Sequence, residues 1–171
     1  STLRKRGWAI SPLPSNLIPY PFFFTNPALS KVSRSAVVLG GTDEALGNSL
    51  TQRADRVISF QDDCLENFSA DLYKDVLYSI IQEEGPYMTL MGHTSWGMDL
   101  APALAIKTGY PLVSDCVNIV IEDGPPRGIR QIYSGKVFSR VSPRESAGYL
   151  FSIRPGSFIP PEDMQERQGE L

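Results

Sequence analysis

The sequence predicts an α/β fold: a three-layer, Rossmann-like domain with a mainly parallel sheet and a short antiparallel extension at its C-terminal end. The main observation is the stretch from Tyr87 to Asp115. In it an apolar run, a loop of small residues, an alanine-rich helical segment and a second apolar run follow one another. This order is typical of the βαβ unit of a parallel sheet. Ligands and partners usually meet such folds at the loops that leave the carboxyl ends of the strands.

Length and composition are those of one ordinary globular domain. The chain has 171 residues, 42% of them apolar and 20% charged, and its net charge is −3. A chain of this length can bury a full core without disulfides, and its slightly negative charge gives no general attraction to nucleic acid or anionic lipid. No apolar run approaches the roughly 18 residues that a membrane span needs. We therefore expect no nucleic-acid partner, no membrane insertion, and a cytoplasmic or organellar matrix protein.

Three regions of the chain differ in composition. Residues 1–34 form a proline-rich N-terminal segment; within it, the prolines of residues 11–27 exclude a long helix, and this stretch is expected to run over the surface. Residues 35–159 carry the strand and helix patterns of the domain, and residues 160–171 form a polar tail or linker. The run Phe22–Phe24 is expected either to lie beneath the sheet edge or to form an apolar patch for a partner.

The first predicted unit is a strand, a glycine turn and a helix. Residues 36–39 are compact and apolar, Gly40 and Gly41 end the strand, and capping and acidic residues favour a helix from Thr42 to about Arg53.

The second predicted unit begins with the strand at residues 56–60. A helix capped near Ser69 follows it and ends at Gly85, because glycine is the usual residue after a helix terminus. Its apolar residues recur at the spacing of one helix face; they are Tyr73, Val76, Leu77, Ile80 and Ile81.

The third predicted unit is the strand at residues 87–91 and a helix from Asp99 to about Thr108. Pro102 then falls in the first turn, where proline is tolerated because the N–H groups there have no intrahelical partner. Beyond Leu112, turns separate short apolar runs, which are expected to form antiparallel hairpins or a sheet extension. These runs are residues 116–121, 129–133, 136–141 and 148–153.

Several motifs resemble the electron-transfer flavoprotein alpha subunit family. The sequence GHTSWGMDLAPALAIKTGYPLVSDC is similar to its Gly-x-Thr-x-x-Gly-Arg-Asp-Leu-Ala-Pro signature with a following Ala-Asp-Cys, although Met98 replaces the usual arginine and Ser114 the usual alanine. SIRPGSF, residues 152–158, resembles the Thr-Val-Arg-Pro-Gly-x-Phe that closes the first domain of the family. Other landmarks keep the same order over about residues 35–160, whereas the first forty residues lack the family's opening strand and long helix.

The resemblance implies an N-terminal, scaffold-type domain of an alpha subunit. Such a domain pairs with a beta subunit and supports electron transfer through FAD, which is held mostly by a second domain in the family. We therefore expect FAD in the full assembly and none bound by this chain alone, a beta-type partner, a possible self-dimer of the isolated chain, and no catalysis by this chain alone. The adenine-nucleotide alpha-hydrolase-like fold that the resemblance implies is shared with nucleotide-binding enzymes.

The alternative is therefore a stand-alone adenine-nucleotide-binding module or an ATP-dependent enzyme. Its support is Gly40-Gly41-Thr42-Asp43, which resembles the Ser-Gly-Gly-x-Asp-Ser loop of ATP pyrophosphatases in part. Glu44 weighs against it, because a carboxylate in the first helical turn occupies the helix end that would bind phosphate. The other interpretation is that the glycines only turn a strand into a helix.

Candidate cofactor-binding residues are His93, Thr94, Ser95 and Arg154, all in the context of a flavin domain. For Thr94 and Ser95, together with Asp99, the alternative role is capping of the helix N-terminus.

Other polar and aromatic residues have a structural interpretation beside any functional one. Asp115 and Arg154 are expected to be structurally paired, because charges between apolar strands are costly when unpaired; the alternative for Arg154 is to face a flavin or the partner subunit. Trp96 is either a partner anchor or part of the core edge. No catalytic set is discernible. Cys64, Cys116 and the single histidine indicate neither a disulfide nor a metal site.

Overall fold

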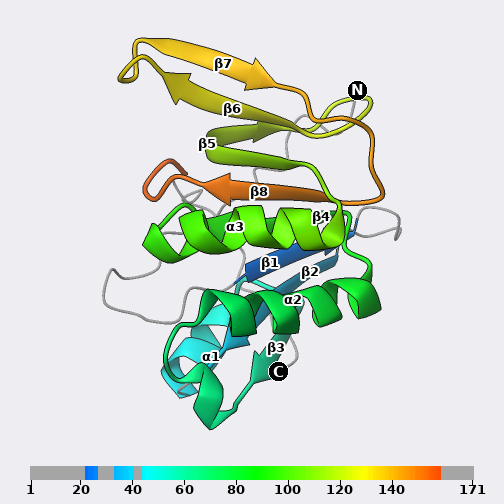
Figure 1. Cartoon of the computed structure of the whole chain (residues 1–171), viewed down its shortest axis with the longest axis vertical. Coiled ribbons are helices and arrows are strands. Elements are labelled where there is room, and N and C mark those ends of the chain that lie inside the picture. The colour runs from blue at the N-terminus through cyan, green and yellow to red at the C-terminus, as the bar shows by residue number, and fades with distance from the viewer. Residues whose placement is uncertain (1–21, 27–32, 41–43, 159–171) are drawn as a thin grey trace.

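The computed structural model describes residues 22–26, 33–40 and 44–158. These residues form one sheet with helices on both faces (Figure 1). In chain order the elements are β1 (Phe22–Asn26), β2 (Ser33–Leu39), α1 (Glu44–Thr51), β3 (Arg56–Phe60), the short 3-10 helix η1 (Asp63–Leu65), α2 (Ala70–Glu84), β4 (Met88–Gly92), α3 (Ser95–Thr108), β5 (Leu112–Val120), β6 (Arg127–Ile132), β7 (Val137–Val141) and β8 (Tyr149–Ile153).

The eight strands lie in the order β3-β2-β1-β4-β8-β5-β6-β7. β2 and β3 pair in parallel, and β8 pairs in parallel with β4 on one side and β5 on the other. β1 runs antiparallel to both of its neighbours, so β3, β2, β4, β8 and β5 all point the same way. The expected α/β fold with a mainly parallel sheet is confirmed.

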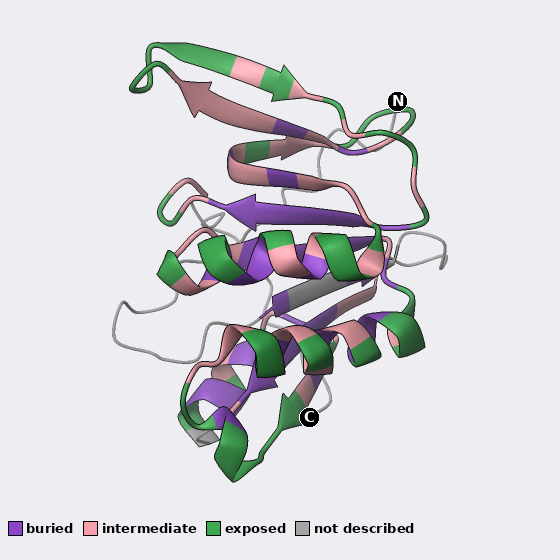
Figure 2. Ribbon diagram, viewed as in Figure 1, coloured by how far each residue is buried: buried purple, intermediate pink, exposed green. Residues whose placement is uncertain are grey.

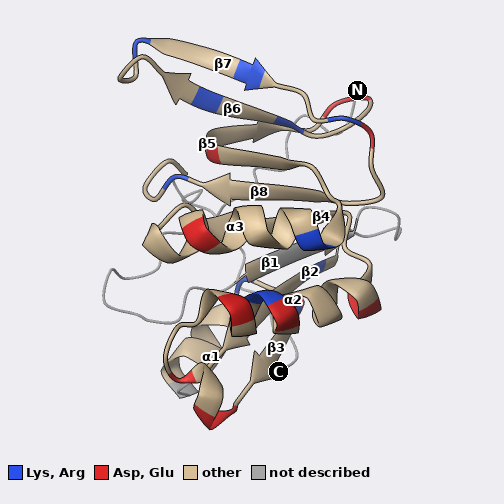
Figure 3. Ribbon diagram, in the orientation of Figure 1, with Lys and Arg blue, Asp and Glu red and all other residues tan. Residues whose placement is uncertain are grey.

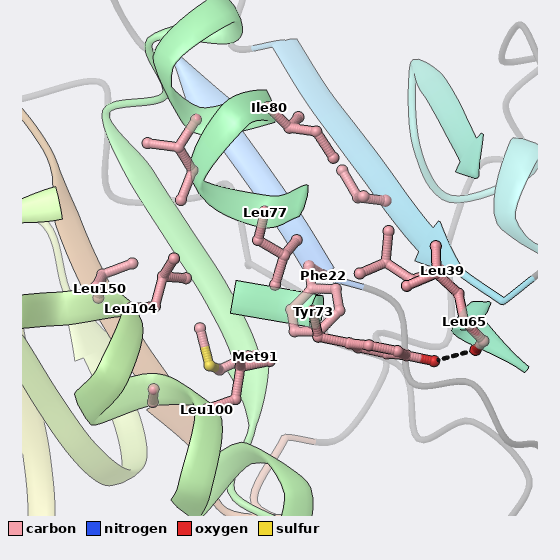
Figure 4. Close-up of a cluster of buried hydrophobic side chains, with 13 residues drawn as sticks. Phe22, Leu39, Leu65, Tyr73, Leu77, Ile80, Met91, Leu100, Leu104 and Leu150 are labelled. Atoms are coloured by element: carbon pink, nitrogen blue, oxygen red, sulfur yellow. Dashed lines mark hydrogen bonds between the residues drawn. The ribbon is translucent and has the colours of Figure 1, made fainter. Parts of the chain in front are cut away.

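The core is divided by the sheet into layers. On one face, α2 and α3 pack on the sheet through Tyr73, Leu77 and Leu104, against Leu39 and Leu150 among others (Figure 4). On the opposite face, α1 packs its two buried leucines on β2. A further buried cluster lies on β4, β8 and β5 opposite α3; it comprises Met88, Leu90, Val113, Cys116, Tyr149, Phe151 and Ile153.

The helix α2 follows the pattern of its sequence closely. Ser69 occupies the N-cap position without a capping hydrogen bond from its side chain, and Gly85 ends the helix in the left-handed conformation, with φ 53°. Of the expected stripe, Tyr73, Leu77, Ile80 and Ile81 are buried, and Val76 packs against the core. The predicted helix is therefore confirmed in its start, its end and its apolar face.

The helix α3 begins one turn earlier than its proline indicates. Ser95 is its first residue, Thr94 is its N-cap, and Pro102 lies inside it rather than in its first turn. The helix thus forgoes the backbone hydrogen bond that an N–H at position 102 would donate. A close approach fixes this start: a Cβ atom on Gly97 would lie 1.9 Å from the carbonyl oxygen of Gly92. The expected start at Asp99 is wrong.

Two expectations about strands also change. The run Phe22–Phe24 does not follow the surface: it belongs to β1, which lies inside the sheet between β2 and β4, and Phe22 is buried. The antiparallel extension is confirmed for β5, β6 and β7. The last run, however, forms β8, which returns to the middle of the sheet and pairs in parallel on both sides.

Other expectations lie partly outside the described residues. These are the structure of residues 1–21, the cap at Thr42 and Asp43, the tail 160–171 and the side chain of Glu44. The part of the glycine turn that is described supports a structural role for Gly40. Its φ is +91°, and a Cβ atom there would lie 2.6 Å from the carbonyl oxygen of Leu65. Gly40 is therefore required by the turn and by close packing.

Candidate functional site

A cluster of polar side chains lies at the carboxyl ends of β4, β8 and β5. His93 directly follows β4, Arg154 directly follows β8, and Asp115 lies within β5. Backbone hydrogen bonds hold these strand ends together. The N–H of His93 donates to the carbonyl oxygen of Ile153 over 2.7 Å, and the N–H of Arg154 donates to the carbonyl oxygen of Cys116 over 2.9 Å. Parallel strands bring their carboxyl ends to one edge of a sheet, which is where such folds usually bind ligands.

A bulge in β5 turns Asp115 toward this cluster. The pairing of β5 with β8 shifts between Val113 and Cys116, both of which face the side opposite α3. Asp115 has φ 57°, a left-handed conformation that is uncommon outside glycine but is tolerated best by Asp and Asn. Its side chain consequently reaches the side of the sheet that carries Arg154.

Asp115 and Arg154 form a bidentate ion pair. The Nε atom of Arg154 donates to Oδ1 of Asp115 over 2.8 Å, and Nη2 donates to Oδ2 over 2.6 Å. The remaining nitrogen, Nη1, donates to the Gln131 side chain in β6. These hydrogen bonds from Arg154 lower the pKa of Asp115 despite its partial burial, and they raise the pKa of Arg154. The expected pairing is confirmed, and it joins β5, β6 and β8.

Ser152 connects the ion pair to the histidine. Its Oγ accepts a hydrogen bond from the backbone N–H of Asp115 over 3.1 Å and lies 2.9 Å from Nδ1 of His93. The Ser152 hydroxyl can donate its proton to Nδ1, which leaves the ring proton on Nε2; the Nε2 atom lies 3.9 Å from Oδ1 of Asp115. Ser152 is fully buried, so its hydroxyl needs these partners.

Thr94 and Ser95 have different roles at the start of α3. The Thr94 side chain accepts a hydrogen bond from the backbone N–H of Gly97 over 3.3 Å, which is the geometry of an N-cap. Ser95 is exposed in the first turn, and Asp99 is exposed one turn later. Trp96 stacks on Phe68, with ring centroids 4.6 Å apart, at the edge of the core.

The Ser152 hydroxyl lies against His93, but it is fully buried and cannot reach a substrate, and the described residues hold no metal site. Burial raises the pKa of the Cys116 thiol to about 12, so this cysteine is a neutral core residue at physiological pH. No three metal-binding side chains gather anywhere in the described ranges. The arrangement binds strands to one another, and its polar atoms are largely used for that purpose.

Sequence reasoning missed two members of the cluster, Ser152 and Gln131. Ser152 had a usable signal, since it is the one polar residue in the apolar run YLFSI, and buried hydroxyls need partners. Gln131 had none, because its role depends on the pairing of β6 beside β5.

The described helices all end before residue 109, and none has the length and apolar character needed to cross a membrane.

Comparison with known proteins gives consistent matches. The family model described as "Electron transfer flavoprotein domain" matches residues 28–171. An electron transfer flavoprotein subunit alpha of Bacillus subtilis is 32% identical over 136 residues, which are 79% of this chain and 42% of that protein. That of Syntrophomonas wolfei is 34% identical over 125 residues, 71% of this chain and 38% of that protein.

A third relative carries a different name. The lactate dehydrogenase (NAD(+),ferredoxin) subunit LctC of Acetobacterium woodii is 25% identical over 154 residues, 84% of this chain and 37% of that protein. The chain thus spans about two fifths of the length of these relatives. Because the family model covers most of the sequence and the fold is the one that the family motifs imply, the chain belongs to the electron transfer flavoprotein domain family.

Proposed function

We propose that this chain acts as the N-terminal, scaffold-type domain of an electron-transfer flavoprotein alpha-type subunit. In this role it works with a beta-type subunit and supports FAD-mediated electron transfer from a dehydrogenase. This proposal is supported by the family match over residues 28–171 and by relatives that are named alpha subunits. The relative LctC bears the name of a dehydrogenase subunit, so the partner class includes dehydrogenase complexes.

Most of the candidate flavin contacts already have hydrogen-bond partners inside the domain. Arg154 uses its guanidinium on Asp115 and Gln131, Thr94 caps α3, and the Nδ1 atom of His93 lies against Ser152. These side chains fit a framework better than a flavin cradle, because most of their hydrogen-bonding groups already have partners inside the domain. We therefore propose FAD for the full assembly only, and no catalysis by this chain alone. A contact from His93, Thr94, Ser95 or Arg154 to the flavin would require another domain to reach them.

A cofactor titration tests this proposal. FAD, and separately ATP, is titrated into the purified chain by calorimetry. The expected result is a colourless protein that binds neither at micromolar concentration. The complete reading frame that contains this sequence, co-expressed with its beta-type subunit, is expected to purify yellow and to hold FAD. Micromolar binding of ATP by the chain alone, with release of pyrophosphate, contradicts the proposal in favour of an enzyme. A colourless complete complex contradicts it as well.

A further inference from the structure

The outer face of α3 carries an apolar stripe. The helix packs its inner face on β4, β8 and β5, and it lies beside α2. Met98, Pro102 and Ile106 are exposed at intervals of four residues, so they follow one another along the helix surface (Figure 2). Ile106 is 85% exposed, more than any other large apolar side chain in the described ranges, and Met98 is 50% exposed. The helix thus presents apolar side chains both to the core and to solvent.

This distribution is unusual for a helix at the surface of a protein. Only two of the 14 residues of α3 are charged, Asp99 and Lys107. A surface helix normally sets a polar face against its apolar one, and a helix that is apolar all round is normally buried. The core covers only one side of α3, the side that carries Leu100 and Leu104. The composition of the outer face therefore indicates that another protein surface covers it.

The charges of α3 indicate which surface that is. Asp99 lies in the second turn of the helix and Lys107 in its last turn, near opposite ends (Figure 3). If two α3 helices pack antiparallel about a two-fold axis near Pro102, Asp99 lies about 4.5 Å from the axis along one helix and Lys107 about 7.5 Å from it along the other. These two side chains then come within reach of each other, and Met98 of one copy lies on Ile106 of the other. The stripe is self-complementary, as a two-fold interface requires.

Both charged groups are available for such a contact. Asp99 is exposed and has no ion-pair partner among the described residues. Lys107 binds Asp75 of α2 over 2.5 Å, but its side chain is 33% exposed, and its three N–H donors allow it to bind a second carboxylate. The acidic residues of α2 beside this face do not oppose a second copy, because Asp71 is paired with Lys74 and Asp75 with Lys107.

We infer that α3 is the contact surface of a homodimer, in which two copies of this chain pair antiparallel through Met98, Pro102 and Ile106. Asp99 of each copy binds Lys107 of the other at the two ends of the contact. This inference goes beyond the proposed function, because the surface involves neither a flavin nor a beta-type subunit. One helix from each copy gives a small interface, so we expect a weak dimer with a dissociation constant on the order of 10 µM.

Sedimentation equilibrium of the purified chain tests for this dimer. At concentrations from about 1 to about 200 µM, which bracket the expected constant, the average mass is expected to rise from the 18.9 kDa of one chain toward twice that value. Ile106→Glu is expected to weaken association about ten-fold or more, because it buries an unpaired charge in the contact. Phe138→Glu is the control, since Phe138 is 63% exposed but lies on β7. The control is expected to associate like the parent.

A charge exchange tests the antiparallel arrangement. Asp99→Lys and Lys107→Glu each place like charges opposite one another, and each is expected to weaken association about ten-fold. In an equal mixture of these two variants, both ion pairs form again between unlike copies, so the mixture is expected to regain the association of the parent. Asp123→Lys is the control for Asp99→Lys, because it makes the same change of charge at an exposed position between β5 and β6.

The outcomes decide the inference without touching the proposed function. Circular dichroism and thermal melting first establish that each variant is folded. If Lys107→Glu does not fold, because it loses Asp75, the decision rests on Ile106→Glu and Asp99→Lys. A chain that stays monomeric over the whole range overturns the inference. A dimer that Ile106→Glu leaves unchanged, or that Phe138→Glu disrupts, overturns it as well, and so does a mixture of folded charge variants that regains no association. The proposed function is tested separately, by the cofactor titration and the complete complex.

Discussion

Strands β8 and β7 have the same length and lie in the same sheet, yet they serve different purposes. Every residue of β8 is buried, whereas none of β7 is (Figure 2). Each contains a phenylalanine: Phe151 is completely buried between Leu90 and Val113, and Phe138 is 63% exposed. The difference shows that the position of a strand in the sheet, and not the type of residue, decides whether an aromatic side chain is buried in the core or remains exposed to solvent.

The largest expected effect comes from the buried side of this comparison. Phe151→Ala is expected to lower the free energy of unfolding by about 3–5 kcal/mol, because it leaves a cavity in a fully buried site. Urea denaturation followed by circular dichroism measures this value. A loss below about 1 kcal/mol would mean that the centre of the sheet is less tightly packed than the structure shows, and the comparison would fail.

A second variant examines the boundary between the two regions, where Arg154 links β8 to β5 and β6. Asp115→Asn keeps a residue that tolerates the positive φ but removes the charge that Arg154 binds. We expect a loss of about 1–2 kcal/mol at neutral pH, because hydrogen bonds to charged groups contribute more than neutral ones but this site is partly exposed.

The pH dependence of that loss has a defined sign. The pKa of Asp115 is lowered in the folded protein, so its contribution is complete above its ordinary unfolded value near 3.9. The contribution declines as the pH falls below that value and through the lower folded pKa. Urea denaturation at a series of pH values from 7 toward 3 checks this. A difference between parent and variant that does not change with pH would show that shape, not charge, matters at this position.

The third prediction concerns the start of α3. Thr94→Ala is expected to destabilise the protein by about 1 kcal/mol, because it removes the acceptor for the Gly97 N–H group. Ser95→Ala and Asp99→Ala serve as controls and are expected to melt like the parent, since both side chains are exposed. If Thr94→Ala has the same melting temperature as the two control variants, Thr94 does not act as a cap.

The smallest effect is expected on the exposed side of the comparison. Phe138→Ala is expected to change the free energy of unfolding by no more than about 0.5 kcal/mol, because a largely exposed side chain loses few contacts. The measurement is the same urea denaturation as for Phe151→Ala. A loss close to that of Phe151→Ala would place Phe138 in the core of the fold, and the comparison between the two strands would fail.

The parts of the fold that were predicted from the sequence are those with local causes. The stripe and final glycine of α2, and the apolar run of β3, depend on residues close in the chain. The start of α3 was missed because the rule for proline applies to an average helix, whereas here Gly97 fits against Gly92 and fixes an earlier start. The insertion of β8 between β4 and β5 depends on partners far along the chain. Its continuous apolar run was nevertheless a signal, since strands buried on both faces lack alternation.

The candidate site shows the same division. The pairing of Asp115 with Arg154 followed from the cost of unpaired charge between apolar strands. The bulge that turns Asp115 toward Arg154, and the hydroxyl of Ser152 that joins it to His93, depend on how β5 and β8 align. Register of this kind is set by the assembled sheet, and a single sequence carries little information about it.

The antiparallel strand β1 has a consequence for how the protein assembles. It is the strand through which β2 and β3 are hydrogen-bonded to the rest of the described sheet, since it pairs with β2 on one edge and with β4 on the other. During synthesis β1 leaves the ribosome before either partner and can pair early with β2, which follows it closely. Its other edge stays open until Leu90, the partner of Phe23, has been made. Closing this contact between distant parts of the chain is an intrinsically slow step, so the two halves of the sheet are expected to join late in folding.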